Sequence, residues 1–206
     1  YARYKPLTYY EGERDEREVQ SQKNLAKFMK ILLIKRLESS FHAFRLTLDR
    51  FIRSYDRVIE EVHKGHVYIS KENINRVFDF LETDDQEAID RLLEAEKAER
   101  LAAKDFNPDF LKDLEGDRKI LGQIHELWKG SKRDPKWEAC HEMLHGDATL
   151  KKGKLIIFTE SKETAEYIAG RIGDEVERDV LLFTGNSGES VRREVIANFD
   201  AKAYQQ

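Results

Sequence analysis

The pattern from which the fold is predicted lies at residues 154–168, which read KLIIFTESKETAEYI. The stretch begins with a short continuous apolar run, as expected of a strand that is buried on both faces. Ser161 can then cap a helix over residues 162–172. A second apolar run at residues 179–184 precedes a helix from about 189 to 199. Strand, helix, strand and helix with short links predict the beginning of a parallel, doubly wound sheet.

Two strands make a poor sheet of this kind. A parallel sheet needs both faces covered, and most sheets have four or more strands. The chain stops at Gln206, where a third strand would be expected. We therefore expect the sequence to be a truncated piece of a longer protein.

Residues from about 20 to 146 carry helical patterns almost throughout. The clearest pattern is a set of apolar residues at alternating spacings of three and four, which places them on one face of a long helix. These residues are Leu37, Phe41, Phe44, Leu48, Phe51, Tyr55, Ile59 and Val62. Such a face must be buried against a partner, so a non-catalytic helical interaction module is one hypothesis for the chain.

Shorter signals mark the other helices. Helices are predicted at residues 71–81 and from about 83 to 103. Asn107-Pro108 and Asp134-Pro135 each combine an N-cap residue with a proline suited to the first helical position. The fold predicted from the sequence is therefore mixed, with mainly helical residues 1–133 followed by α/β residues 134–206.

The composition limits where the protein acts. The chain has 206 residues and a net charge of −4, so it lacks the basic footprint of a nucleic-acid-binding domain. Its one cysteine, Cys140, excludes an internal disulfide and fits a reducing compartment, which favours the cytoplasm. The longest apolar run, residues 31–34, is far shorter than the ~20 residues that a bilayer requires, so no membrane partner is expected.

Both predicted strand-to-helix turns bring hydroxyl groups and free backbone N–H groups to the start of a helix, which suits a phosphate oxygen. The candidate residues are Thr159, Ser161 and Lys162 in the first turn and Thr184, Gly185 and Arg192 in the second. Contacts of this kind position a nucleic acid without reading its sequence. The alternative is that Ser161 is only an N-cap and Arg192 only a surface charge. The residues alone favour that alternative, because every parallel α/β protein has such turns.

Residues 154–199 resemble the opening of the second RecA-like lobe of superfamily-two helicases. In that lobe the first strand ends in Phe-Ser/Thr, as at Phe158-Thr159 here. The second strand ends in a glycine, here Gly185, and Arg192 and Phe199 follow at the family's spacing. The resemblance implies that residues 134–206 begin a helicase C-terminal lobe with a parallel sheet.

Two further segments resemble related proteins. Asp134-Pro135-Lys136 and the helix after it resemble the segment that precedes this lobe in many Swi/Snf-type members. Residues 35–40, Lys-Arg-Leu-Glu-Ser-Ser, resemble the Arg-Leu-x-Ser-Ser segment of bacterial Swi/Snf-like translocases. The three segments cover about half the chain and agree in order. Residues 66–130 match none of these segments and are interpreted as a family-variable insertion, so residues 1–133 are expected to be a helical insertion or linker.

The resemblance implies a fragment of an ATP-dependent DNA helicase or translocase, with nucleic acid, expected to be duplex DNA, and the first RecA-like lobe as partners. ATP and magnesium would act in the parent protein. The chain itself has no Gly-x-x-x-x-Gly-Lys-Ser/Thr cradle, since Gly153-Lys154 is followed by Leu155, and it has no Asp-Glu-x-His pair. It also ends before the arginine motifs of the second lobe. Phosphoryl transfer needs all three, so no catalytic residue and no cofactor are expected in the fragment alone.

A competing signal is His141-Glu142-x-x-His145, which satisfies the His-Glu-x-x-His zinc motif on a predicted helix. The two histidines would share a face and bind zinc, with the glutamate as general base of a hydrolase. Gly146 stops the helix immediately, and a third ligand would have to come from Glu163 or Glu166. Coincidence is therefore the favoured interpretation, and no metal is expected.

Overall fold

The computed structural model describes residues 1–70, 98–131, 133–176 and 178–200. The chain divides into two compact units, Tyr1–Lys132 and Arg133–Gln206, and each is described by itself. Within the described ranges, no helix combines the length and the apolar character needed to cross a bilayer.

The apolar face predicted for one long helix is shared by two. Helix α1 (Glu16–Ser39) ends where α2 (Phe41–His63) begins, and Ser40 lies between them in extended conformation. The Ser40 side chain caps α2 by accepting a hydrogen bond from the backbone N–H of Ala43 at 3.0 Å. The Arg-Leu-x-Ser-Ser segment is therefore a helix–helix corner in which Arg36 is buried.

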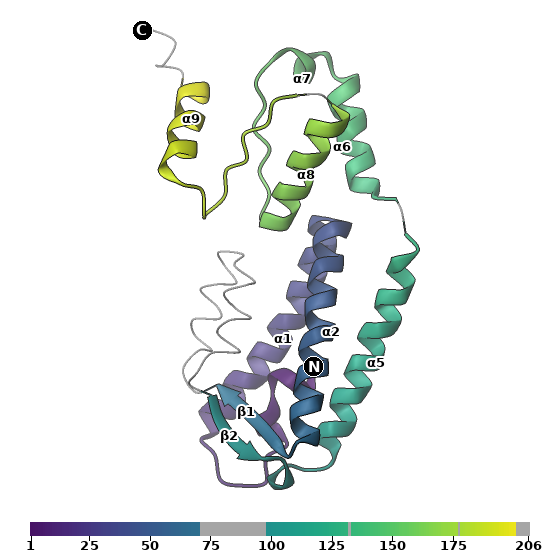
Figure 1. The fold of residues 1–206 in the computed structure, drawn as a ribbon, viewed down its shortest axis with the longest axis vertical. Coiled ribbons are helices and arrows are strands. Elements are labelled where there is room, and N and C mark those ends of the chain that lie inside the picture. Colours follow the sequence, from purple (N-terminus) through teal and green to yellow (C-terminus); the bar gives the residue numbers. More distant parts are fainter. Residues whose placement is uncertain (71–97, 132, 177, 201–206) are drawn as a thin grey trace. The chain divides into compact units, whose positions relative to one another are not determined.

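Helix α2 packs against both α1 and α5 (Asp109–Lys129) in the first unit (Figure 1). The side chains at the centre of this core are Met29, Leu48, Phe51, Tyr55, Phe110 and Leu114. The apolar face of α2 is thus covered by helices of the same chain.

The N-terminal segment belongs to this core as well. It forms two short 3-10 helices, η1 (Ala2–Tyr4) and η2 (Pro6–Thr8), whose residues Ala2, Tyr4 and Leu7 are buried. The backbone N–H of Leu7 donates to the side-chain oxygen of Gln22 on α1 at 2.9 Å. The segment is therefore fixed to the helices by polar and apolar contacts.

A two-stranded antiparallel sheet follows α2. Gly65, with φ of +88°, lets the chain turn out of the helix, and β1 (His66–Ser70) pairs with β2 (Ala98–Ala102) so that Val67 lies opposite Leu101. The helix predicted from about 83 to 103 is therefore wrong over residues 98–102. The predicted helix at residues 71–81 lies outside the described residues, as do residues 83–97.

The second unit contains four helices in its described part: α6 (Pro135–Gly146), α7 (Ala148–Lys152), α8 (Lys162–Glu175) and α9 (Glu189–Phe199). The helices predicted after Asp134-Pro135, at 162–172 and at 189–199 are thus present. A small core of Trp137, Leu144 and Ile172 joins α6 to α8, with Leu155 packed against it.

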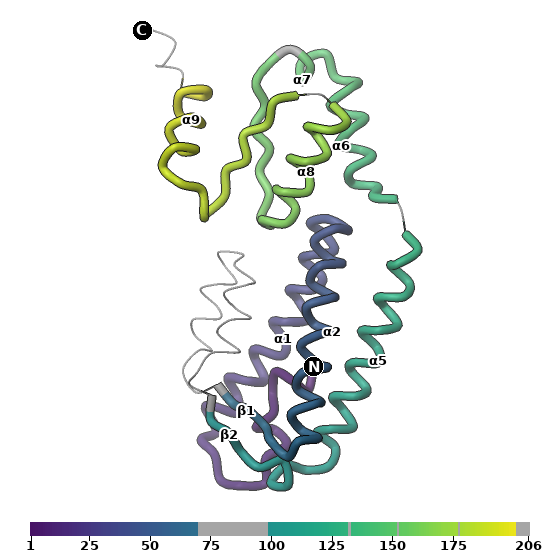
Figure 2. The backbone as a smooth tube through the Cα atoms, viewed as in Figure 1, coloured from purple at the N-terminus to yellow at the C-terminus, as the bar shows by residue number. Residues whose placement is uncertain are grey.

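The predicted parallel sheet is wrong. The described residues form no sheet besides β1–β2, and the apolar runs at 154–159 and 179–184 are uncoiled backbone between helices (Figure 2). A strand exists only where neighbouring backbone accepts and donates its hydrogen bonds, and two short apolar runs cannot cover each other on both faces. The RecA-like fold inferred for residues 134–206 is therefore corrected to a helical unit, in whose described part the two apolar segments form no strands.

Candidate functional site

The first candidate turn is organised around the cap of α8. The Ser161 hydroxyl oxygen accepts a hydrogen bond from the backbone N–H of Thr164 at 3.3 Å, and its O–H donates to the Glu163 carboxylate at 3.1 Å. The backbone N–H of Ser161 donates to the Thr159 hydroxyl oxygen at 3.2 Å. Ser161 and Glu163 are both buried. The hydroxyl of Ser161 is thus committed to capping, and Glu163 brings a carboxylate to the helix end where a phosphate would sit.

Lys162 is the basic group of this turn. Its ammonium lies 3.8 Å from the Glu166 carboxylate, one helical turn further along α8. The ion pair is partly exposed to solvent, so it is weak enough for the ammonium to approach another anion.

The second candidate turn is more open. The backbone N–H of Thr184 donates to the Ser187 hydroxyl oxygen at 2.8 Å, and the backbone N–H of Ser187 donates to the Thr184 carbonyl at 3.0 Å. Gly188 then precedes α9 without a side-chain cap. A Cβ atom built on Gly185 or Gly188 would meet nothing within 4 Å. Residues 188–190 are exposed, so the uncapped start of α9 is open to solvent, and Arg192 lies exposed in the first turn of that helix.

Lys154, at the start of the apolar segment 154–159, contacts the end of α9. The Lys154 ammonium donates to the backbone carbonyl of Asn198 at 2.6 Å and lies 5.8 Å from the centre of the Phe199 ring. This contact joins the start of the first apolar segment to the end of α9.

Comparison of the chain with protein-family models, with curated proteins and with solved structures found no significant match.

The zinc motif lies on α6 as expected. The His141 and His145 rings are 4.1 Å apart between their centres, and the Nδ1 atom of His145 hydrogen-bonds to the His141 carbonyl at 2.9 Å. Glu163 is turned toward Ser161 and Glu166 lies beside Lys162. In the part of the chain that the structure describes, no group of three metal-ligating side chains is present.

We predict that the purified chain binds no stoichiometric zinc. Two histidines one turn apart provide two ligands, and structural or catalytic zinc takes at least three from the protein. Elemental analysis after dialysis against metal-free buffer checks this. About one zinc per chain that is lost in His141→Ala and retained in His42→Ala would contradict the prediction.

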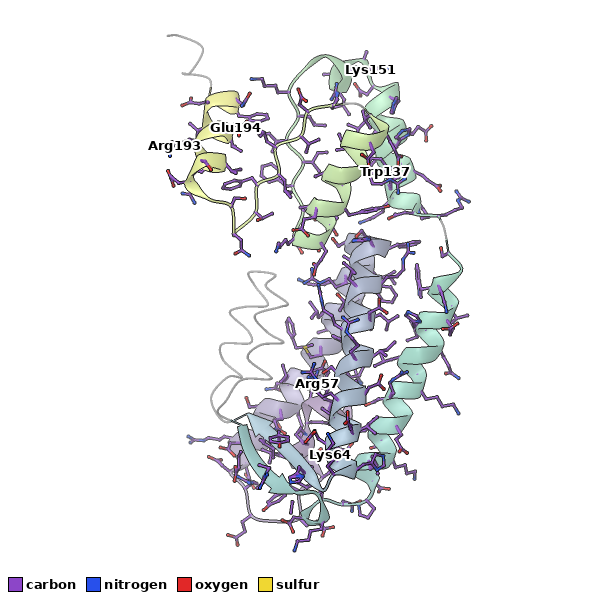
Figure 3. The ribbon with its side chains drawn as sticks, viewed as in Figure 1. Arg57, Lys64, Trp137, Lys151, Arg193 and Glu194 are labelled. Atoms are coloured by element: carbon purple, nitrogen blue, oxygen red, sulfur yellow. The ribbon has the colours of Figure 1, made fainter. Side chains whose placement is uncertain are left out.

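The polar cluster that holds α6 on α8 was not predicted from the sequence. The indole N–H of Trp137, labelled in Figure 3, donates to the Glu175 carboxylate at 2.9 Å. Arg171 pairs with the same carboxylate and lies 4.9 Å from the Trp137 ring centre. The hydrogen bond from Arg171 is the main cause that lowers the pKa of Glu175. The Arg171–Glu175 spacing of four residues is a readable helix signal. The contact of that pair with Trp137 joins residues far apart in the sequence, so the sequence alone could not predict it.

Arg178 is a second residue whose structural role was not predicted from the sequence. Its guanidinium donates to the carbonyls of Leu150 and Lys151, at 2.8 and 2.5 Å. These carbonyls lie in the last turn of α7, where cations satisfy helix-end acceptors. Arg178 therefore ties the chain after α8 to the segment that leads into residues 154–160.

Proposed function

We propose that the chain is part of an ATP-dependent DNA helicase or translocase, to which it contributes contacts with nucleic-acid phosphates and a connection between lobes. The observation that carries the proposal is the open start of α9, where Thr184 and Gly185 lead to uncapped backbone N–H groups and Arg192. A helix N-terminus of this kind favours an anion. The order of the three segments that resemble such proteins supports the same assignment.

The chemistry available is binding without base reading. Backbone N–H groups and one arginine can hold one or two phosphate oxygens, and such contacts position a duplex but carry no sequence information. The first turn contributes less, because Ser161 is used as a cap and Glu163 repels phosphate. We place ATP and magnesium in other parts of the parent protein and the whole in the cytoplasm, in keeping with the single cysteine.

The net charge of the second unit predicts that this binding is weak. Residues 133–206 contain 11 Lys or Arg against 14 Asp or Glu, so the unit is acidic as a whole. Each phosphate neutralised releases counterions and lowers the logarithm of the association constant by about 0.9 per unit of log salt concentration. One or two contacts therefore give a slope of roughly −1 to −2.

We predict weak binding of duplex DNA without sequence preference at low salt. Arg192→Ala is expected to weaken it several-fold and Lys162→Ala less, because Lys162 already has Glu166 beside it. Fluorescence anisotropy with two labelled duplexes of unrelated sequence checks this. Lys112→Ala is the matched control, because Lys112 is an exposed lysine of α5 in the other unit.

Two results would contradict the assignment of the contacts. If the wild type binds and both variants bind equally well, phosphate is held elsewhere, and the arginine-bearing helix α2 becomes the next surface to test. If the two duplexes differ strongly in affinity, the contacts read bases, which neither turn can do.

A further inference from the structure

The segment from 154 to 160 displays apolar side chains that the rest of its unit leaves uncovered. Phe158 is 88% exposed and Ile156 is 54% exposed, and Ile157 is exposed as well. Figure 2 shows this segment as an elongated stretch of backbone between α7 and α8. Leu155, by contrast, packs against the α6–α8 core. An exposed run of large apolar residues of this kind is unusual and is typical of a surface that takes part in an interaction.

The backbone of the same residues indicates what kind of polypeptide fits. Among the described residues, no backbone hydrogen bond involves positions 155–158. Unpaired N–H and C=O groups along an elongated segment form a template for a β-strand. A helix cannot satisfy them, because its own backbone groups are already paired. A strand that also carries apolar side chains would satisfy both the backbone groups and the exposed side chains.

The charges at the two ends of the segment indicate which strand would pair with it. Lys154 lies three residues before Ile157, and Glu160 lies three residues after it. We propose that this segment pairs antiparallel with the same segment of a second copy of the chain, with Ile157 facing Ile157 across a two-fold axis. Lys154 of each copy then lies opposite Glu160 of the other, and Ile156 lies opposite Phe158.

This arrangement is favoured over the parallel one. Opposite charges directly across a sheet stabilise a strand pair and like charges destabilise it. An in-register parallel pair would set lysine against lysine and glutamate against glutamate. The antiparallel pair is also isologous, so both copies use the same surface. Lys154 keeps a role in the monomer through the Asn198 carbonyl, but an ammonium has three donors and can serve both.

The second apolar segment lacks this complementarity. Residues 180–183 are also exposed, but Asp179 precedes them and no basic residue follows before Arg192. Pairing of that segment with its own copy would gain no charge contact. The proposal is therefore confined to residues 154–160.

Sedimentation equilibrium of the whole chain at low salt, over a range of concentrations, tests the pairing. The average mass is expected to rise from the monomer value of 24.2 kDa toward twice that value. Lys154→Glu and Glu160→Lys each place two like-charged pairs across the interface and are expected to weaken association about tenfold. The double variant K154E/E160K restores opposite pairs and is expected to recover wild-type association.

Mixing gives the sharpest readout. The two single variants, each weakened alone, are expected to associate with one another. In a mixed dimer, one chain carries acidic side chains at both positions 154 and 160 and the other carries basic side chains at both, so each cross-strand pair joins opposite charges. Leu127→Lys, at an exposed apolar position of α5, is the matched control and is expected to change nothing. A wild type that stays monomeric overturns the proposal, and so does a double variant or a mixture that associates no better than the single variants.

Discussion

Phe51→Ala is expected to lower the free energy of unfolding of the first unit by about 3–5 kcal/mol, the usual cost of truncating a buried aromatic side chain. Phe51 is only 2% exposed and lies at the centre of α2. Its ring meets the Tyr4 ring at 5.9 Å and the Tyr1 ring at 6.3 Å between centres. The substitution leaves a cavity where α2 contacts the N-terminal segment.

Urea denaturation followed by far-ultraviolet circular dichroism measures this effect. Ile34→Ala is the matched control, because Ile34 is an apolar residue of α1 whose side chain is 58% exposed. It is expected to change the free energy of unfolding by less than about 0.5 kcal/mol. Equal effects of the two substitutions would show that the core is not centred on α2.

Alkaline pH is expected to destabilise the same unit through Tyr55. Burial is the main cause that raises the pKa of Tyr55 far above its ordinary value of 10, and the charge of Asp117 raises it further. The Tyr55 hydroxyl donates to the Asp117 carboxylate at 3.1 Å. The folded state therefore favours the neutral phenol, because a phenolate would lose this hydrogen bond and be repelled by the carboxylate. Its contribution is complete below pH 10 and is lost as pH rises beyond that value, because only the unfolded chain then releases the proton.

The measurement is the free energy of unfolding between pH 9 and 11 for the wild type and Tyr55→Phe. One proton per chain corresponds to a slope of about 1.4 kcal/mol per pH unit above pH 10. Tyr55→Phe is expected to reduce the slope by up to this amount, although it also removes a hydrogen bond at neutral pH. Tyr9 adds to the remaining slope, because burial and its hydrogen bond to Asp113 raise its pKa too. Identical slopes for both proteins would contradict the role given to Tyr55.

Local signals predicted most of the helices. Asp134 caps α6 by accepting from the backbone N–H of Trp137, and Ser161 caps α8, as their residue types predicted. The spacing of three and four correctly identified the buried face of α2. Such signals are readable because they involve residues within one or two helical turns of each other.

The errors in the predicted fold concern contacts between distant residues. Residues 98–102, Ala-Glu-Arg-Leu-Ala, have a helical composition, yet they form β2 because β1 supplies their hydrogen bonds. The run at 154–159 has the composition of a buried strand, yet it forms no strand because the described part of its unit supplies no neighbouring strand. Strand propensity shows only that a segment could form part of a sheet. Whether it does depends on neighbouring strands, which the propensity does not predict.

The candidate site was predictable only in part. The sequence correctly placed Ser161 and Lys162 at the start of one helix and Arg192 near the start of another. It did not reveal that the Glu163 carboxylate folds back onto Ser161, because a side-chain rotamer is set by burial and packing. The difference between a closed first turn and an open second turn therefore required the structure. Nucleic-acid binding at either turn stays a prediction.

The position of Asp117 has a consequence for the order of folding during synthesis. Its carboxylate accepts from the backbone N–H of Ala2 at 2.6 Å, a contact between residues 115 positions apart. A ribosome must therefore release α5 before this contact can form, and until then the part of the α2 surface that α5 covers stays exposed. Closing so long a loop late makes this step slow relative to helix formation. The interval in which a chaperone or a protease can reach the nascent chain is thus set by when α5 emerges.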